Sequence, residues 1–418
     1  MKKTLLLSLL LLQAVACTKQ KDQTAIPQIN QSLIQTKDLL WNLDSLQQAP
    51  PFRYLDSTSH VHEIIFKGPD YKGKETEVLA YYSNPDILKT GRNQGHTYPG
   101  IVLISGDSQP GIKEWVERWA QEGYAAITCD YGNTCLAEGR GPITKNLEEI
   151  LNYIYDSISD GPKAVRAYRT AAIAIQAHSL LLNQQEVIKD KTVVTGISWG
   201  GFQTCIVSGL DNRFKAAVPV YGCAFHDEIM LDKNHFNQLS EEQKATWMAK
   251  IDPKNYLKYS QCPTLFITGD NDGCFDIEAY DKTTQLIPEK NRYYRITPNM
   301  GHAHDIGWQP QEIAVFFNAI LKEGVPLAKI TDIVQNDTQI IGNYESPLTI
   351  KEAHFYYTND TTHINAERIW NHIPATIHKN KIVVNFPKEN FVYGYFYLTD
   401  TKDLSISSKL IKNNTYEE

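Results

Sequence analysis

The residues best suited to chemistry centre on Ser198, within the stretch Gly196-Ile197-Ser198-Trp199-Gly200. A β-branched run at 193–195 precedes this stretch and a helix-compatible segment at 202–208 follows it, so the expected order is strand, sharp turn and helix. Glycines two residues before and after the serine leave room for neighbouring backbone that a Cβ would block. Such a turn exposes the serine Oγ at the C-terminal edge of a sheet, facing the first amides of the next helix. The pattern favours a nucleophile that attacks carbonyl groups, and a turn with no catalytic role is the alternative.

A serine hydroxyl needs a base in contact with it and a carboxylate that orients the base. Three aspartates follow the strand expected at 264–268: Asp270, Asp272 and Asp276. Asp272 lies four residues after the strand in a Gly-x-x-Asp turn and is the expected acid. Asp270 is expected to cap the turn locally, and Asp276 to be the N-cap of a helix that starts at Ile277.

The expected base is His302, in the loop Asn299-Met300-Gly301-His302 after the last strand of the sheet. His304 competes for this role or lines the pocket. The His-x-His pair could also ligate a metal, but neither H-E-x-x-H nor a carboxylate cluster accompanies it. We therefore expect no metal and no cofactor.

Acyl transfer also requires two amides that stabilise the oxyanion. One is the backbone N–H of Trp199, and the other is expected from Ser105-Gly106-Asp107-Ser108, with Asp107 as the donor by position. The carboxylate of Asp107 would then have to point away from the developing charge. An irregular stretch from 130 to 163 follows a strand and is expected to shape the pocket. We expect Tyr131, Tyr221 and His304 to contact the substrate.

These residues must be positioned by an α/β scaffold. Apolar runs expected as buried strands at 101–104, 124–128, 193–195, 214–220, 264–268 and 292–296 are each followed by a helix or an insertion. This alternation predicts a mostly parallel, doubly wound sheet, preceded by an antiparallel hairpin at 61–66 and 77–82. We expect residues 51–325 to form this catalytic domain.

The character of the chain changes after Gly324. Turn residues separate β-rich runs at 349–357, 376–386 and 391–398, none of which shows helical periodicity. These runs predict a small C-terminal antiparallel β-domain at 326–418, sandwich-like by its length and strand count. The domain could bind glycan or cover one flank of the hydrolase, and the second interpretation is favoured because no set of residues converges on a site.

The N-terminus predicts export. Residues 1–16 combine two lysines, a short apolar run and small residues, which is typical of a removable signal peptide. Ala14-Val15-Ala16-Cys17 resembles a bacterial lipobox, so Cys17 is expected to be lipidated; an ordinary signal with a chance cysteine is the alternative. Residues 17–50 are expected to be a polar tether. The expected location is the bacterial cell envelope, periplasmic or at the outer-membrane surface, with membrane contact only through the lipid anchor.

Composition excludes several classes of protein. Removal of residues 1–16 changes the net charge from −7 to −9. An acidic chain without a basic stretch is a poor binder of nucleic acid. Six cysteines remain after Cys17, of which Cys129 and Cys135 are the closest in sequence and could pair in an oxidising envelope. The absence of C-x-x-C argues against a zinc ribbon or a thioredoxin-type site.

Three segments together resemble the α/β-hydrolase superfamily: VVTGISWGGFQTCIVSGLDNRFKAAVPVYGCAF, DPKNYLKYSQCPTLFITGDND and NMGHAHDIGWQPQEIAVFF. Within it they look like bacterial acetylxylan-esterase-like and prolyl-oligopeptidase-like hydrolases, over roughly residues 60–325. The resemblance implies that Ser198 is the nucleophile, Asp272 the acid and His302 the base. Many relatives have His-Gly where this chain has Ser105-Gly106. An aromatic residue directly after the nucleophile, here Trp199, is more similar to the pattern of the peptidase branch. The roughly sixty residues before the hydrolase segment, however, are too few for the β-propeller of those peptidases.

We therefore expect a serine hydrolase of carboxylic esters that removes acetyl groups from glycans through an acyl-enzyme, its substrate a small-molecule or oligosaccharide ester. The first alternative is an aminopeptidase or dipeptidyl-peptidase, in which Glu138, Glu148 and Glu149 could anchor a free N-terminus. The second is a non-catalytic glycan-binding lipoprotein with a hydrolase fold.

Overall fold

The computed structural model describes residues 39–106, 111–131, 134–135, 139–140, 155, 157–336, 338–361, 365–387 and 391–413. The signal segment, Cys17, residues 18–38 of the expected tether, Asp107 and the glutamates at 138, 148 and 149 lie outside these ranges. Within them, no helix has the length and apolar character needed to span a membrane.

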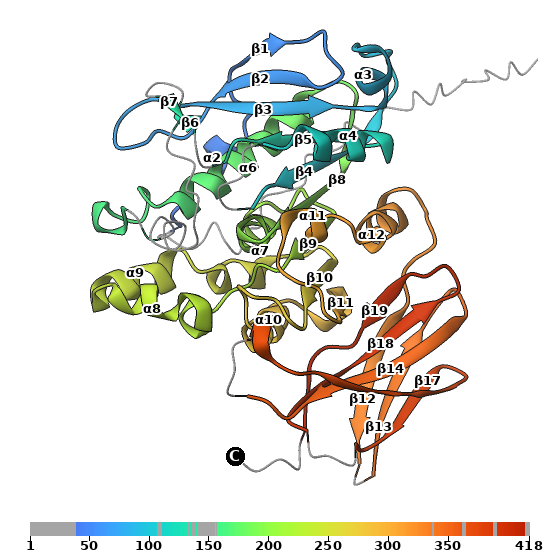
Figure 1. The fold of residues 1–418 in the computed structure, drawn as a ribbon. Helices are drawn as coiled ribbons and strands as arrows, with labels where there is room; N and C mark the ends of the chain where they lie inside the picture. The colour runs from blue at the N-terminus through green and yellow to red at the C-terminus, as the bar shows by residue number, and fades with distance from the viewer. Residues whose placement is uncertain are drawn as a thin grey trace, which may run out of the picture.

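A nine-stranded sheet forms the centre of the larger domain (Figure 1). Its spatial order is β1 (Phe52–Asp56), β2 (His62–Lys67), β3 (Glu77–Ser83), β5 (Ala125–Cys129), β4 (Tyr98–Ile104), β8 (Val187–Ile197), β9 (Ala216–Val220), β10 (Thr264–Gly269) and β11 (Arg292–Thr297). The strands from β5 to β11 pair in parallel, whereas β1, β2 and β3 pair antiparallel at one edge. The predicted parallel sheet with an opening hairpin is confirmed, and β1 is an additional edge strand.

Both faces of this sheet are covered by helices, which explains why its strands read as continuous apolar runs. Successive residues of β4 alternate between two hydrophobic clusters: Ile101 and Leu103 belong to one, and Val102 and Ile104 to the other. The first cluster packs against α4 (Lys113–Gln121) and α12 (Gln311–Leu321). The second packs against α6 (Arg166–Asn183) and α7 (Trp199–Leu210). This two-sided burial fixes the positions of the strand ends where the predicted site residues lie.

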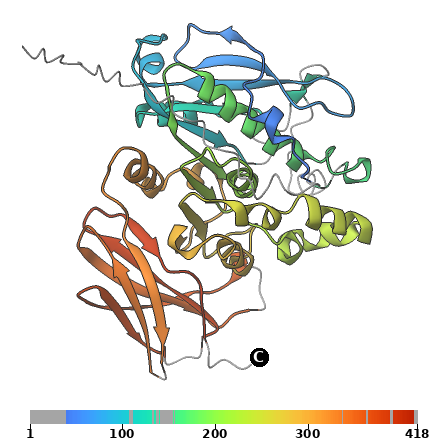
Figure 2. The same cartoon turned by 180° about the vertical axis from the view of Figure 1, so that it is seen from behind.

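Shorter helices complete the domain. They are α2 (Leu43–Leu46), α3 (Pro85–Thr90), α8 (Met230–Gln238), α9 (Glu241–Lys250), α10 (Ile277–Thr284) and α11 (His304–Gly307), and a two-stranded pair is formed by β6 (Thr134–Cys135) and β7 (Gly139–Arg140). The segment between β9 and β10 consists mainly of α8 and α9, which project to one side of the sheet in both views (Figures 1 and 2).

The stretch expected as a tether at 17–50 ends earlier than predicted, because residues from Leu40 onward are built into the core. Leu40, Trp41, Leu43 and Leu46 are buried. The Trp41 ring stacks on Tyr168 of α6 with centroids 5.5 Å apart, and its Nε1 donates to the Tyr168 carbonyl at 2.9 Å. The segment 39–46 therefore acts as a strap that covers α6.

The C-terminal domain is made of two antiparallel sheets. One has the order β12 (Lys329–Gln335), β13 (Gln339–Glu345), β17 (Lys381–Asn385) and β16 (Thr376–His378). The other has the order β15 (Asn371–Pro374), β14 (Ile350–Thr358), β18 (Tyr393–Asp400) and β19 (Ser405–Ser407), with β20 (Ile411–Lys412) also paired to β18. The predicted sandwich-like architecture is confirmed.

The core of this sandwich is continuous with that of the hydrolase. Ile340 and Phe355, one from each sheet, belong to the same hydrophobic cluster as Phe316 of α12. At the junction, the Ile296 amide of β11 donates to Ser407 Oγ of β19 at 2.8 Å. The two domains are therefore joined through a buried, hydrogen-bonded interface beside β11 (Figure 1).

Trp41→Ala is expected to lower the free energy of unfolding by about 3–5 kcal/mol, because it removes a buried indole and leaves a cavity against α6. Chemical denaturation followed by circular dichroism measures this change. Leu55→Ala, at a β1 side chain that is 55% exposed, is the control and should change stability by about 0.5 kcal/mol or less. Equal losses in the two variants would show that segment 39–46 does not contribute to the core.

Candidate active site

Ser198 sits between β8 and α7 in a backbone conformation that few residues other than glycine adopt. Its φ is +61° and its ψ is −119°. The neighbouring backbone is packed too tightly for side chains: a Cβ at Gly200 would lie 1.9 Å from the Ile104 carbonyl oxygen, and one at Gly196 would lie 2.2 Å from the Gly200 carbonyl oxygen. The Ser198 amide donates to the Val220 carbonyl at 2.9 Å, which ties the turn to β9. The sequence pattern of a strained turn flanked by obligatory glycines is therefore present in the structure.

Ser198, His302 and Asp272 come together at the ends of β8, β11 and β10. Ser198 Oγ lies 2.7 Å from His302 Nε2, and His302 Nδ1 lies 2.8 Å from Asp272 Oδ2. An ionised carboxylate only accepts hydrogen bonds, so Nδ1 carries the proton and Nε2 accepts from the serine hydroxyl. This is the hydrogen-bonding order of a serine, histidine and aspartate triad.

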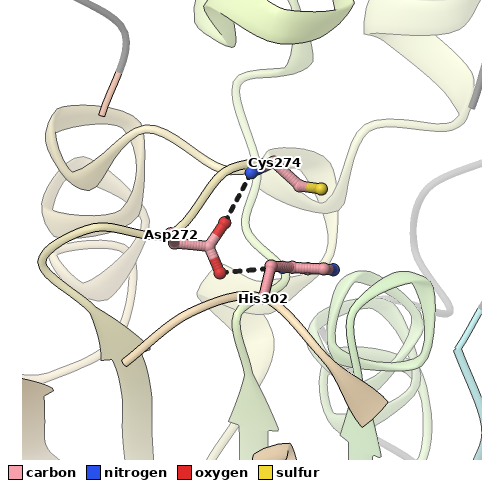
Figure 3. A group of neighbouring side chains, drawn as sticks. All are labelled: Asp272, Cys274 and His302. Carbon is pink, nitrogen blue, oxygen red and sulfur yellow. Dashed lines mark hydrogen bonds and ion pairs between the residues drawn. The ribbon is translucent and has the colours of Figure 1, made fainter. Parts of the chain in front are cut away.

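Asp272 is fully buried, and its second oxygen is also occupied. Oδ1 accepts from the amides of Cys274 at 2.8 Å and Phe275 at 2.7 Å, as part of the turn that leads into α10. These two bonds hold the carboxylate in place and leave Oδ2 facing the imidazole (Figure 3). The position of the acid is thus determined by the local turn as well as by its contact with His302.

Two opposing effects act on the pKa of His302. Burial lowers it, whereas the charge of Asp272 and the hydrogen bond to that carboxylate raise it by more, so the net shift is upward. The imidazole must be neutral to accept the Ser198 proton. Activity should therefore rise with pH as His302 loses its proton, over a range above the ordinary pKa of a histidine.

The hydroxyls of Tyr131 and Tyr221, two of the residues predicted to contact the substrate, bind the main chain. Tyr131 is buried and donates to the Leu103 carbonyl at 2.9 Å. Tyr221 is also buried and donates to the Gly301 carbonyl at 3.1 Å, with its ring centroid 4.6 Å from that of His302. Tyr221 thus supports the loop that holds the base. Sequence position after a strand does not distinguish this role from substrate contact.

The loop after β4 passes close to the nucleophile, as the oxyanion prediction requires. A Cβ at Gly106 would lie 3.5 Å from Ser198 Cβ and 3.3 Å from His304 Cδ2. Asp107, the next residue, lies outside the described residues, so its predicted role as donor stays a prediction. Trp199, whose amide is the other expected donor, begins α7 and buries its ring against Phe202 with centroids 4.7 Å apart.

His304 lies beside this loop, at the start of α11. Its ring packs edge-on against Trp115 and Trp308, and its buried Nε2 has no hydrogen-bond partner among the described residues. Burial lowers the pKa of His304 to about 4, so the ring is neutral near pH 7. Of the three predicted substrate contacts, His304 is the one with a ring nitrogen that lacks a hydrogen-bond partner among the described residues.

Asp272, Cys274 and His302 place a carboxylate oxygen, a thiol sulfur and a ring nitrogen within 4.8 Å of one another (Figure 3). This is a possible metal-ligand set by composition. However, His302 uses Nδ1 to bind Asp272 and Nε2 to bind Ser198. A metal ion at this position would have to displace one of the two hydrogen bonds that define the triad.

One prediction about this region is wrong. Asp270 does not cap its own turn: its oxygens accept from the Asn299 amide and the Tyr395 hydroxyl, both at 2.7 Å. Cys129, which could have paired with Cys135, is a free, fully buried thiol. Asp276 does occupy the N-cap position of α10, but its side chain makes no capping hydrogen bond.

Comparison with known proteins agrees with this fold. Residues 170–321, which include all three triad residues, match the model of the prolyl oligopeptidase family. An acetyl xylan esterase from Paenibacillus sp. R4 has a similar structure, with a TM-score of 0.50 and 20% identity over 67% of this chain and 92% of that chain. A search of curated protein sequences gave no match.

Two other solved structures show weaker similarity. Acetyl xylan esterase 1 from Thermoanaerobacterium sp. JW/SL YS485 has a TM-score of 0.47 and 16% identity, over 66% of this chain and 92% of that chain. An acylaminoacyl peptidase from Pyrococcus horikoshii has a TM-score of 0.44 and 16% identity, over 63% and 41% of the two chains. The similarity to the Paenibacillus structure shows the α/β-hydrolase fold, and the triad together with the family match identifies a serine hydrolase.

Asp272→Asn is expected to lower kcat by about 10⁴-fold, because an amide can donate to Nδ1 and so stabilise the wrong tautomer of His302. Loss of the negative charge also removes the largest effect that raises the pKa of His302, so the acid limb of the kcat/KM profile should move to lower pH. Hydrolysis of p-nitrophenyl acetate measured across pH tests both effects. Asp190→Asn, an exposed change at the opposite end of β8, is the charge-matched control and should alter neither. A full-rate Asp272→Asn enzyme would contradict the assignment of the acid.

Proposed function

We propose that the protein hydrolyses carboxylic esters and removes acetyl groups from glycans through a covalent acyl-enzyme. The observation that carries the proposal is the hydrogen-bonded chain from Ser198 Oγ through His302 to buried Asp272. The acetyl group is suggested by the acetyl xylan esterase whose fold this chain shares.

The geometry assigns a step to each residue. His302 Nε2, 2.7 Å from Oγ, takes the hydroxyl proton as Ser198 attacks the carbonyl carbon. The amide of Trp199 at the start of α7, together with one from the loop after β4, stabilises the oxyanion. The imidazolium, held by Asp272, then protonates the departing alcohol. A water molecule deprotonated by the same histidine releases the acid and restores the Ser198 hydroxyl.

Three buried aspartates near the triad are not available to bind the free N-terminus of a peptide. An aminopeptidase needs a carboxylate that can pair with the substrate ammonium. Asp272 and Asp270 are bound as described above, and both oxygens of buried Asp252 accept from the amides of Phe225, His226 and Lys254. These three buried aspartates are therefore committed to internal hydrogen bonds.

A peptidase is the second candidate, because the matched family model is that of the prolyl oligopeptidases. The same triad cleaves amides when the leaving amine is protonated by His302. The glutamates at 138, 148 and 149, which could anchor an ammonium group, lie outside the described residues.

A substrate panel decides between these activities. Acetylated xylo-oligosaccharides and p-nitrophenyl acetate are expected to have kcat/KM values at least about 10²-fold above those of dipeptide p-nitroanilides. Ser198→Ala should lose about 10⁶-fold in kcat on every substrate. A clear preference for the anilides would replace the esterase with the peptidase. No turnover of either class, with acetylated glycan still bound, would favour the non-catalytic alternative.

We also propose that the protein is a lipoprotein of the bacterial cell envelope, anchored through Cys17. The proposal rests on the signal-like residues 1–16 and on Ala14-Val15-Ala16-Cys17. Palmitate is expected to label the protein in cells, and Cys17→Ser should abolish the label. Labelling that survives this substitution would contradict the anchor.

A further inference from the structure

The loop that holds the catalytic acid, residues 269–276, is bound by the C-terminal β-domain; we call it the acid loop. We infer that the C-terminal domain is part of the catalytic apparatus, and that its residues Asn365 and Tyr395 position Asp272. The inference relies on the triad, and it holds whether the substrate is an ester or an amide.

The first set of contacts comes from the segment 365–370, which precedes β15. Buried Asn365 donates from Nδ2 to the Asp272 carbonyl at 3.2 Å. In return, Asn271 of the acid loop donates from Nδ2 to the carbonyls of Asn365 at 3.3 Å and Arg368 at 2.8 Å. The residue before the acid and the acid itself are thus both bonded to the C-terminal domain.

The second set of contacts acts on Asp270, two residues before the acid. Tyr395 of β18 donates its hydroxyl to Asp270 Oδ2 at 2.7 Å, and Trp370 donates from Nε1 to the Asp270 carbonyl at 3.0 Å. Asp270 Oδ1 accepts from the amide of Asn299, which lies three residues before the base His302, at 2.7 Å. Residues 298–303, between β11 and α11, hold His302, and we call them the base loop. Asp270 therefore joins the acid loop, the base loop and the C-terminal domain at one buried carboxylate.

These donors are themselves fixed by packing. Tyr395 is fully buried in a cluster with Ile277 of α10, Ile296 of β11 and Leu410. Arg368, whose side chain is 3% exposed, pairs with Glu278 of α10 at 2.8 Å. Helix α10 follows the acid loop and strand β11 precedes the base loop. Both therefore contact the same part of the C-terminal domain.

Catalysis depends on the short distance between Asp272 Oδ2 and His302 Nδ1. Asp272 orients His302 only while Oδ2 stays within hydrogen-bonding reach of Nδ1, and it now lies at 2.8 Å. A misplacement of about 1 Å in an active site can cost about 10²-fold in rate. Tyr395 and Asn365 touch no reacting atom, so they are positioning residues that act through Asp272.

Tyr395→Phe is expected to lower kcat about 10-fold with little change in KM, because it removes the hydroxyl that holds Asp270. The acid limb of its kcat/KM profile should move to lower pH, in the direction expected for Asp272→Asn. The matched control is Tyr397→Phe. Tyr397 lies two residues further along β18 on the same face, and its hydroxyl makes none of these bonds. The control should behave as the unmodified protein.

A double-mutant cycle separates positioning from general destabilisation. If Tyr395 acts through Asp272, adding Tyr395→Phe to Asp272→Asn should cause no further loss of kcat. The same 10-fold loss in both backgrounds, or a Tyr395→Phe enzyme as active as Tyr397→Phe, would overturn the inference. Thermal unfolding is measured for each variant, and Asn365→Ala replaces Tyr395→Phe in the cycle if the latter is destabilised. The cycle uses whichever substrate the unmodified enzyme turns over, so failure of the esterase proposal leaves it interpretable.

Discussion

The close approach of backbone segments around Ser198 is the constraint on which the rest of the site depends. A φ of +61° at a residue with a side chain persists only because the surrounding structure holds it. Here the holding contacts are backbone against backbone: Gly200 against β4 and Gly201 against β9 leave no space for a Cβ, and the Ser198 amide binds Val220. The helices on both faces fix those strands, so the packing of the whole sheet determines where Oγ points.

The other two triad residues lie on loops that need support from elsewhere. His302 is backed by the Tyr221 ring, and the acid loop is bonded to the C-terminal domain through Asp270 and Asn365. The nucleophile thus belongs to the rigid centre of the sheet, whereas the acid lies where the two domains meet. This division makes the distance between His302 and Asp272 the part of the triad that is most sensitive to how the domains fit together.

The sequence predicted those features that have a local signal. Ser198, Asp272 and His302 each follow an apolar strand by a few residues with recognisable turn chemistry, and the parallel sheet follows from runs buried on both faces. The segment around Trp41 was missed because α2 has only four residues, too few to show periodicity. Tyr395 lies 125 residues from its partner Asp270, and Asn365 lies 93 residues from its partner Asp272. Their local sequences are those of an ordinary strand and an ordinary loop, and carry no motif that indicates a catalytic role. Contacts made across that separation depend on tertiary packing, which no local pattern encodes.

In the proposed mechanism, His302 activates Ser198, which then forms a covalent intermediate. Reaction with a fluorophosphonate, followed by intact-mass and peptide mass spectrometry, tests this claim directly. We expect one adduct per chain, mapped to Ser198, absent in Ser198→Ala and formed much more slowly in Asp272→Asn. An adduct on another residue, or equal labelling of Ser198→Ala, would contradict it.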